Sequence, residues 1–332
     1  MKRIVVIGLT ATLLAAAVVV ASLWQGYRTF ASAPIGADGE AVLWVRPGDT
    51  LISVATRLER LGLAAADWRW RALGRVEQPL IQAGEYRVRS QATPASLVER
   101  MVAGDVVRHR FTIVEGWTLA RLRAALARDP RLARAVGALS DEQLMARLGC
   151  EGCFAEGRFL PETYQFVRGD RDLDLLRRAY AAMERALAAA WADRRADLPL
   201  ESPDELLVLA SLVEMETMVA AERARVAGVF MRRLQRGMRL QTDPTVVYPL
   251  EDFEGRIRRV HLTTDHPWNT YTRGGLPPTP IALPGAASLR AAARPADGEA
   301  LYFVARGDGT HHFSRTLEEH NRAVARYILG EG

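Results

Sequence analysis

The sequence has two cysteines, one lysine and six histidines, and each shortage excludes a class of function. Two cysteines cannot supply the four thiolates of a structural zinc site. Lys2 is the single lysine among 44 basic residues, which indicates an arginine-rich genome composition behind the net charge of +5; a nucleic-acid partner is disfavoured by the export of the chain that its N-terminus predicts. No two histidines have the HExxH spacing of a zincin, which disfavours a zinc hydrolase of that type.

Long apolar runs are also scarce, and the only one lies at the N-terminus. No charged residue occurs between Arg3 and Arg28, and Ile4–Trp24 is almost wholly apolar. About 20 such residues span a bilayer. A cleavable signal peptide is the competing interpretation, because Ala31-Ser32-Ala33 resembles a cleavage site. The length of the run and Pro34 directly after that site favour a retained anchor, with the N-terminus in the cytoplasm.

The region after a small-residue linker has the pattern of a small α+β unit. Strands are predicted at Ala41–Val45 and Gly84–Val88, with helices over Leu51–Leu61 and Asp67–Gly74 between them and a further helix over Pro94–Val102. A strand–helix–helix–strand unit with Gly-Asp-Thr-Leu at its first turn resembles a LysM module, which binds peptidoglycan.

The remaining chain predicts a second, larger domain. The whole sequence of 332 residues is 49% hydrophobic and 25% charged, as expected of a globular protein with two or three domains. One long helix is predicted over 171–195, and strands are expected to cluster in the C-terminal third. We therefore predict an α+β protein with these boundaries: 1–3 cytoplasmic tail, 4–24 transmembrane anchor, 25–40 linker, 41–104 LysM-like subdomain, and 105–332 mixed α+β catalytic domain including a helical connector.

The most informative helix begins at Ser202 and carries a carboxylate among apolar residues. Ser202 is a predicted N-cap, Pro203 the first helical residue, and Glu205 closes a capping box. Three- and four-residue steps place Glu214 on an apolar face, while Glu216 points elsewhere. Apolar surroundings disfavour the charged form of a carboxyl, which suits a general acid at neutral pH. A carboxylate at the edge of the face that reaches solvent is the alternative. The predicted face comprises Leu207, Ala210, Glu214, Thr217 and Met218.

Polar, turn-forming segments follow this helix. Gln241-Thr242-Asp243-Pro244-Thr245 gathers hydrogen-bonding groups at a proline-fixed turn, suited to the hydroxyl and acetamido groups of a sugar. A structural Asx-turn explains the same residues equally well. His266–Tyr271 adds two aromatic rings and the amide of Asn269, and aromatic faces commonly stack on sugar rings.

Several motifs in this order resemble the endolytic murein transglycosylases, the MltG or YceG-like family. By resemblance, the first glutamate of Leu-Val-Glu-Met-Glu-Thr is the catalytic acid/base, which is Glu214. Supporting or substrate contacts are expected from seven residues, each of which is as well explained by a structural hydrogen bond: Glu216, Glu222, Gln241, Thr242, Asp243, Asn269 and Tyr271. The resemblance is carried by Glu156–Phe166, Leu209–Thr217, Val229–Tyr248, Asn269–Tyr271, Gly275–Gly285, Tyr302–Val304 and His312–Asn321.

The resemblance implies cleavage of the MurNAc–GlcNAc β-1,4 bond within nascent glycan strands, which leaves 1,6-anhydro-MurNAc ends and limits strand length. A hydrolytic glycosidase generally needs two carboxylates. A lytic enzyme needs only one, because the 6-hydroxyl of the sugar is the nucleophile. No cofactor and no metal are implied. Three alternatives remain: a non-catalytic peptidoglycan-binding scaffold, a hydrolytic muramidase, and a metal-dependent hydrolase that uses the five histidines from His261 to His320.

The resemblance also implies a location and partners. We expect a single-pass protein of the bacterial inner membrane whose catalytic domain is periplasmic. Its expected partners are peptidoglycan glycan strands and, at the level of the family, peptidoglycan synthases (penicillin-binding proteins), with no nucleic acid. An oxidising compartment favours a local disulfide between Cys150 and Cys153 over a redox or metal role.

Overall fold

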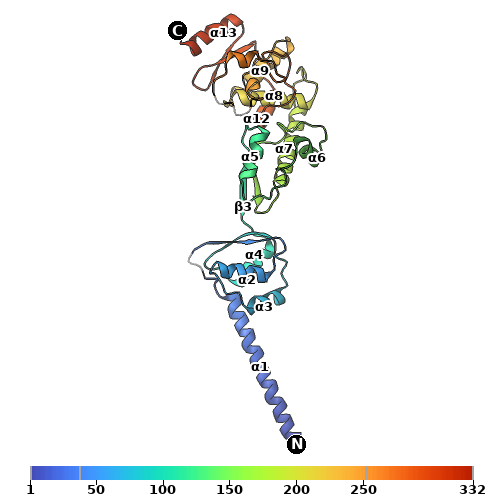
Figure 1. The fold of residues 1–332 in the computed structure, drawn as a ribbon, viewed down its shortest axis with the longest axis vertical. Helices are drawn as coiled ribbons and strands as arrows, with labels where there is room; N and C mark the ends of the chain where they lie inside the picture. The colour runs from blue at the N-terminus through green and yellow to red at the C-terminus, as the bar shows by residue number, and fades with distance from the viewer. Residues whose placement is uncertain (1, 37–38, 251–252, 254, 331–332) are drawn as a thin grey trace. The chain divides into compact units, whose positions relative to one another are not determined.

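The polypeptide folds into two units in this structure, which is a computed structural model (Figure 1). The structure describes residues 2–36, 39–250, 253 and 255–330, so Met1 of the predicted cytoplasmic tail lies outside the described residues. Unit 1 comprises Met1–His109 and Gln165–Gly169, and unit 2 comprises Arg110–Tyr164 and Asp170–Gly332. Both helices and strands occur in each unit, which confirms the predicted mixed α+β class.

Helix α1 (Lys2–Ser32) forms the start of unit 1. Its portion Leu9–Ser32 is long and apolar enough to cross a membrane. The helix continues past the predicted end of the anchor at Trp24 into the predicted linker. It does so because Tyr27 and Phe30 bury their rings in the hydrophobic core of unit 1, where each is only 8% exposed. Residues 37–38 of the predicted linker lie outside the described part of the chain.

The rest of unit 1 follows the predicted order of strands and helices. Strands β1 and β2 are antiparallel, with Leu43 opposite Tyr86, and both of these side chains are fully buried. Thr50 and Thr93 form capping boxes at the starts of α2 and α4, where a hydroxyl accepts from the first-turn backbone. The elements are β1 (Ala41–Val45), α2 (Leu51–Arg60), α3 (Trp68–Glu77), β2 (Gly84–Val88) and α4 (Pro94–Ala103).

A second pair of strands and three helices precede the helix that carries Glu214. Strands β3 and β4 form a two-stranded sheet. Cys150 and Cys153 are disulfide-bonded in the loop after α6, as the sequence predicted. The elements are β3 (Arg108–Thr112), α5 (Leu119–Arg128), α6 (Asp141–Leu148), β4 (Thr163–Val167) and α7 (Asp172–Ala192).

Helix α8 (Pro203–Glu216) is the centre of the unit 2 core and packs against α9 (Arg223–Gln235) and α12 (Ala286–Ala293). All nine residues from Leu206 to Glu214 are buried. The prediction of a single apolar face was therefore wrong, because neighbours cover α8 on every side. Met218 lies beyond the end of the helix and is 94% exposed.

The start of α8 also differs in detail from the prediction. Ser202 is the N-cap, and its hydroxyl accepts from the backbone N–H of Glu205 at 3.2 Å. The predicted capping box is only half formed, because the Glu205 carboxylate accepts from the N–H of Glu201 instead. A carboxylate in the first turn still interacts favourably with the helix dipole.

The C-terminal third is mainly helices and loops around one hairpin, so the prediction that strands cluster there was wrong. Strands β5 and β6 pair antiparallel, with Tyr302 opposite Ser314. The missed helix α12 has an alanine-rich sequence that favours helix. The further elements are α10 (Pro244–Val247), α11 (Arg259–Thr263), β5 (Tyr302–Ala305), β6 (His311–Ser314), α13 (Leu317–Val324) and the π-helical turn η1 (Ala325–Leu329).

Candidate functional site

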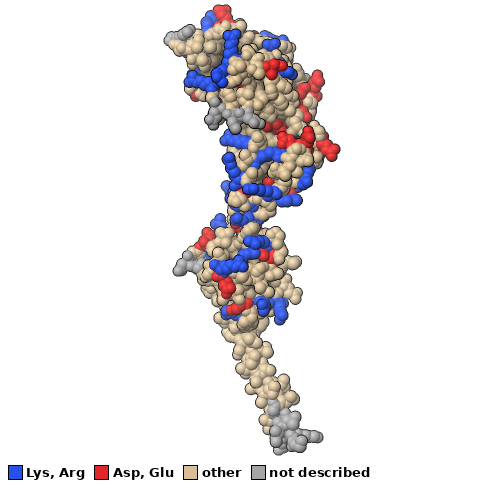
Figure 2. Space-filling view, viewed as in Figure 1, with Lys and Arg blue, Asp and Glu red and all other residues tan. Residues whose placement is uncertain are grey.

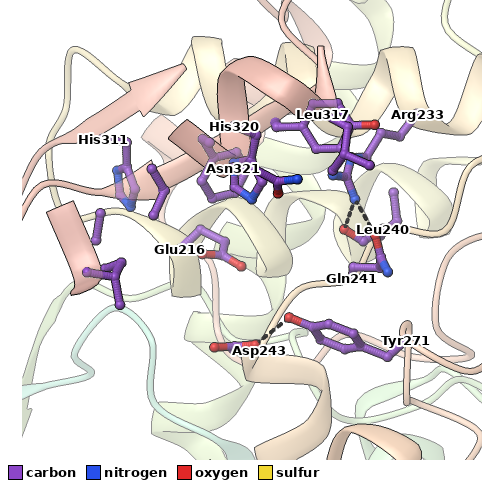
Figure 3. Close-up of a pocket in the computed structure, with 15 residues that line it drawn as sticks. Glu216, Arg233, Leu240, Gln241, Asp243, Tyr271, His311, Leu317, His320 and Asn321 are labelled. Atoms are coloured by element: carbon purple, nitrogen blue, oxygen red, sulfur yellow. Dashed lines mark hydrogen bonds between the residues drawn. The ribbon is translucent and has the colours of Figure 1, made fainter. Parts of the chain in front are cut away.

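A cavity of about 540 Å³ lies in unit 2 beside the C-terminal end of α8 (Figure 3). Its walls come from α8, α9, the segment before α10, the β5–β6 hairpin and α13. Polar and aromatic side chains therefore converge on one space from segments far apart in sequence, as in a binding site for a polar ligand. The polar side chains of the lining include Glu216, Arg233, Gln241, Asp243, Tyr271, His311, His320 and Asn321.

Glu216 is the last residue of α8, and its carboxylate points into this cavity (Figure 3). The hydroxyl of Thr242 donates a hydrogen bond to it. Burial raises the pKa of Glu216 to about 7; the Thr242 hydrogen bond opposes this shift, and the negative charge of Asp243 adds to it. Near neutral pH the side chain is therefore divided between an acid that can donate a proton and a base that can accept one.

Glu214 lies two residues earlier, and the structure gives its carboxylate interior partners. The backbone N–H of Gly285 donates to it at 2.8 Å, and the guanidinium of Arg223 lies 3.6 Å away. The residue is 8% exposed. It is not among the described residues that line the cavity. Glu214 therefore connects α8 to the start of α12 and to α9, whereas Glu216 faces the space that a ligand could occupy.

Gln241 has a left-handed backbone conformation, with φ of 52°, which is unfavourable for a residue with a side chain. Arg233 holds this segment in place. Its Nη1 donates to the carbonyls of Arg239 and Leu240 at 3.0 and 2.9 Å and to Oε1 of Gln241 at 3.3 Å (Figure 3). Its Nε donates to the carbonyl of Leu301 at 2.6 Å. One buried guanidinium therefore joins α9 both to residues 239–241 and to the residue before β5.

Asp243 and Tyr271 line the cavity, and the buried Thr242 directly precedes Asp243 in the chain. The phenol of Tyr271 donates to the Asp243 carboxylate at 2.6 Å (Figure 3). Burial raises the pKa of Tyr271, and the hydrogen bond to Asp243 acts in the same direction, so the phenol stays protonated. The N–H of Thr242 donates to the hydroxyl of Thr270 at 3.1 Å. The segment 241–243 is thus bonded to residues 270–271 on the opposite loop.

Glu222 and Asn269, also predicted as substrate contacts, have partners inside the fold. Glu222 accepts from the backbone N–H and ring Nδ1 of His311 at 3.0 and 2.7 Å, which joins the start of α9 to β6. Burial acts to raise the pKa of Glu222, but these hydrogen bonds outweigh it and the net shift is downward. The Asn269 amide donates to the carbonyls of Leu262 and Thr264 at 3.2 and 2.7 Å. Their predicted substrate role stays a prediction.

Comparison with known proteins identifies the family. The model of the YceG-like family matches residues 43–326, which is most of the chain. The protein belongs to the YceG-like family.

Named relatives agree with this assignment. An endolytic murein transglycosylase of Bacillus subtilis is 31% identical over 264 residues, which cover 74% of this chain and 73% of the relative. One of Streptococcus pneumoniae is 24% identical over 89% of this chain and 60% of its own length. The crystal structure of a YceG-like protein from Listeria monocytogenes matches with a TM-score of 0.58 and 26% identity, covering 86% of this chain and 99% of that one. The resemblance predicted from the motifs is confirmed.

Sequence reasoning missed part of the site of this YceG-like protein. Arg233, Tyr302 and His320 line the cavity but were not among the predicted site residues. The rings of His320 and Tyr302 stack with centroids 5.3 Å apart. Burial lowers the pKa of His320, and the positive charge of Arg233 adds to the shift, so the imidazole is neutral near pH 7. His320 belongs to α13, whose N-cap is Thr316, and nothing in the sequence of this helix indicated that it would line the same cavity as Glu216.

Proposed function

We propose that this YceG-like protein is an endolytic peptidoglycan lytic transglycosylase. Its substrate is the MurNAc–GlcNAc β-1,4 bond within nascent glycan strands, and its products end in 1,6-anhydro-MurNAc, so that it limits strand length. Relatives named endolytic murein transglycosylases support the reaction. The observation that carries the mechanism is the carboxyl of Glu216 in an open polar cavity, with a pKa of about 7.

Glu216 is the acid/base in this proposal. Its protonated carboxyl donates a proton to the glycosidic oxygen as the bond from C1 of MurNAc to O4 of GlcNAc breaks. The resulting carboxylate then accepts the proton of the 6-hydroxyl while O6 bonds to C1. One carboxyl therefore serves both steps and no water is consumed. Attack within a single sugar also gains the effective molarity of an intramolecular reaction.

The sequence alone predicted Glu214 for this role, and that assignment is untested. The geometry favours Glu216, because Glu214 already accepts from Gly285 and lies beside Arg223, away from the cavity lining. We propose that Glu214 is a positioning residue that orients the end of α8. Gln241, Thr242, Asp243 and Tyr271 then contact or position the sugar.

A hydrolytic muramidase is the second candidate, because the cavity holds one further carboxylate. Hydrolysis requires a second carboxylate to activate water or to attack C1, and Asp243 is the candidate. The Asp243 carboxylate already accepts a hydrogen bond from the phenol of Tyr271 at 2.6 Å, which occupies an oxygen that would otherwise activate water and so favours the lytic reaction.

Mass spectrometry of the products released from purified glycan strands tests the proposal. The full-length protein should produce internal fragments with 1,6-anhydro ends, Glu214→Gln should retain part of this activity, and Glu216→Gln should lose it. Reducing ends would indicate a muramidase instead. Activity in Glu216→Gln but not in Glu214→Gln would return the acid/base to Glu214. No cleavage by the wild-type protein would favour a peptidoglycan-binding scaffold.

The location and the remaining partners are proposals as well. We propose that α1 anchors the protein in the bacterial inner membrane, with the N-terminus in the cytoplasm and unit 2 in the periplasm. The single apolar span after Lys2 and Arg3 supports this orientation. The strand and helix order of unit 1 supports a LysM-like module that binds glycan strands. Peptidoglycan synthases are proposed partners by family resemblance alone.

A further inference from the structure

The outer face of α3 in unit 1 has a composition unusual for a surface exposed to water. Trp68 and Val76 are 49% and 53% exposed, and the exposed arginines Arg71 and Arg75 lie on the same side of the helix. Trp70 and Leu73 point the other way and are buried. The face therefore combines an exposed indole and an aliphatic side chain with two cations. Within the described residues, neither cation has an ion-pair partner.

Helix α3 lies directly beside the end of α1. The two helices pack against each other, and the rings of Phe30 and Trp70 meet edge to face with centroids 5.3 Å apart. The guanidinium of Arg69 lies 4.8 Å from the ring of Phe30. Figure 2 shows basic side chains gathered where Figure 1 labels α3, whereas the described part of α1 is free of charge over most of its length.

The position of Phe30 along α1 sets the depth of α3. If the hydrocarbon core ends near Trp24, then Phe30 is about 9 Å further along the helix axis, at 1.5 Å per residue. The headgroup layer on each side of a bilayer is about 5–8 Å thick. Helix α3 is thus attached at the outer edge of this layer. Arginine side chains can reach lipid phosphates from there, and tryptophan favours this depth.

We propose that the outer face of α3 rests on the membrane surface and binds the phosphates of acidic phospholipids through Arg71 and Arg75, with Trp68 and Val76 in the headgroup layer. This inference rests on the proposed membrane anchoring by α1. A basic helix face with an exposed tryptophan has the composition of an interfacial helix, and each arginine near an acidic surface adds to the attraction. Contact at α1 and α3 together would hold unit 1 at the membrane by two helices, which restricts its tilt.

Depth-dependent fluorescence quenching of the full-length protein in vesicles tests the proposal. A thiol-reactive fluorophore is attached to Val76→Cys on α3 or to Val18→Cys on α1, since Cys150 and Cys153 are bonded to each other. The vesicles contain phosphatidylcholine with or without 30% phosphatidylglycerol, together with lipids that carry a quencher either near the headgroup, which reports on position 76, or along the acyl chain, which reports on position 18. In acidic vesicles we expect quenching at position 76 that weakens in phosphatidylcholine alone and in 0.5 M salt.

Variants that change the charge of α3 test whether its arginines bind the membrane surface or whether the helix lies near the membrane only because it packs against α1. Arg71→Glu/Arg75→Glu should shift the equilibrium away from the membrane by at least about 25-fold, since each arginine contributes about fivefold near an acidic surface, and should abolish the quenching at position 76. Arg71→Lys/Arg75→Lys should retain it. Arg121→Glu/Arg128→Glu on α5, with the same change of charge at exposed positions, should leave it unchanged.

The two labels distinguish failure of this inference from failure of the proposed anchoring. If the fluorophore at position 18 on α1 were quenched in acidic vesicles but the fluorophore at position 76 on α3 were not, the α3 contact would be overturned and the anchor would stand. Quenching at 76 that persists in Arg71→Glu/Arg75→Glu would overturn the role of the arginines. Absence of quenching at 18 would overturn the anchoring, and with it this inference.

Discussion

The backbone N–H of Gly285 donates a 2.8 Å hydrogen bond to the carboxylate of Glu214. This bond joins the last turn of α8 to the residue that begins α12, two helices that pack in the core of unit 2. Because Glu216 follows Glu214 by two residues on the same turn, fixing Glu214 also fixes the direction in which Glu216 enters the cavity. In the proposed mechanism the two carboxyls therefore divide the work, with Glu214 positioning the end of α8 and Glu216 transferring the proton.

Truncating Glu214 should destabilise the protein more than truncating Glu216. Glu214→Ala leaves the N–H of Gly285 without its acceptor and the buried guanidinium of Arg223 with only the more exposed Glu115, at 3.7 Å, and should cost about 2–4 kcal/mol in the free energy of unfolding. Glu216→Ala removes a carboxyl from an open cavity and should cost less than about 1 kcal/mol. Urea unfolding monitored by circular dichroism measures both. A larger loss in Glu216→Ala would contradict the division of roles.

The rate of glycan cleavage should decline at alkaline pH. Glu216 must be protonated to act as the acid, and its pKa in the free protein is about 7, so kcat/KM should be highest below pH 7 and fall tenfold per pH unit well above it. The measurement is the initial rate of release of 1,6-anhydro ends between pH 5 and 9. A rate that is independent of pH across this range would exclude Glu216 as the acid.

Thr242→Val should move this alkaline limb to higher pH. The hydroxyl of Thr242 donates to the carboxylate and so favours its charged form; without that donor the pKa of Glu216 rises further. Valine keeps the shape of the side chain. Thr245→Val is the matched control, because it removes a buried hydroxyl that bonds Thr242 and Thr270 but not Glu216. A shift to lower pH in Thr242→Val would contradict the assigned hydrogen bond.

Glu156 is a buried carboxyl outside the cavity and should make stability depend on pH. It accepts from the backbone N–H of Leu119 at 2.9 Å, at the start of α5, and from the phenol of Tyr248 at 3.2 Å. Burial raises its pKa to about 7, and these hydrogen bonds only partly oppose the shift. Between the unfolded value of 4.5 and about 7, the unfolded chain has lost this proton while the folded protein keeps it. The free energy of unfolding therefore decreases as pH rises through this window.

Glu156→Gln should flatten that dependence, because glutamine does not titrate and retains an oxygen for Leu119. The measurement is the midpoint of urea unfolding at half-unit steps from pH 4 to 8. Removing an exposed carboxylate with Glu151→Gln should leave the slope contributed by Glu156 in place. An unchanged slope in Glu156→Gln would show that Glu156 is not its source.

The sequence predicted features that depend on hydrogen bonds within one helical turn, whereas features that depend on tertiary packing could not be derived from it. The capping residue Ser202 marked the start of α8 because its hydrogen bond is made within one turn. The choice between Glu214 and Glu216 could not be made in the same way. Helix α8 is buried on all sides, so its apolar pattern shows no preferred face, and only the contacts of distant segments determine which carboxyl meets the cavity.

Arg233 illustrates the same limit, because its role depends on hydrogen bonds to segments of the chain outside its own helix. Its guanidinium donates to three carbonyls, including that of Leu301, 68 residues away, and to the side chain of Gln241. Lysine at this position cannot reproduce a planar fork with donors on two sides. Arg233→Lys should therefore release the strained segment at Gln241, which lies beside the Glu216 carboxyl in the cavity.

We expect Arg233→Lys to lower the free energy of unfolding by about 2 kcal/mol, since buried carbonyls lose their donor. We also expect it to reduce kcat/KM at least tenfold, because a misplacement of about 1 Å in a positioning segment has effects of this size or larger. Arg236→Lys, at the residue that caps the end of α9, is the control, because that side chain is exposed, and it should change neither quantity. If Arg233→Lys lost stability but kept full activity, the segment 241–243 would not position the substrate, and its residues would be confined to a structural role.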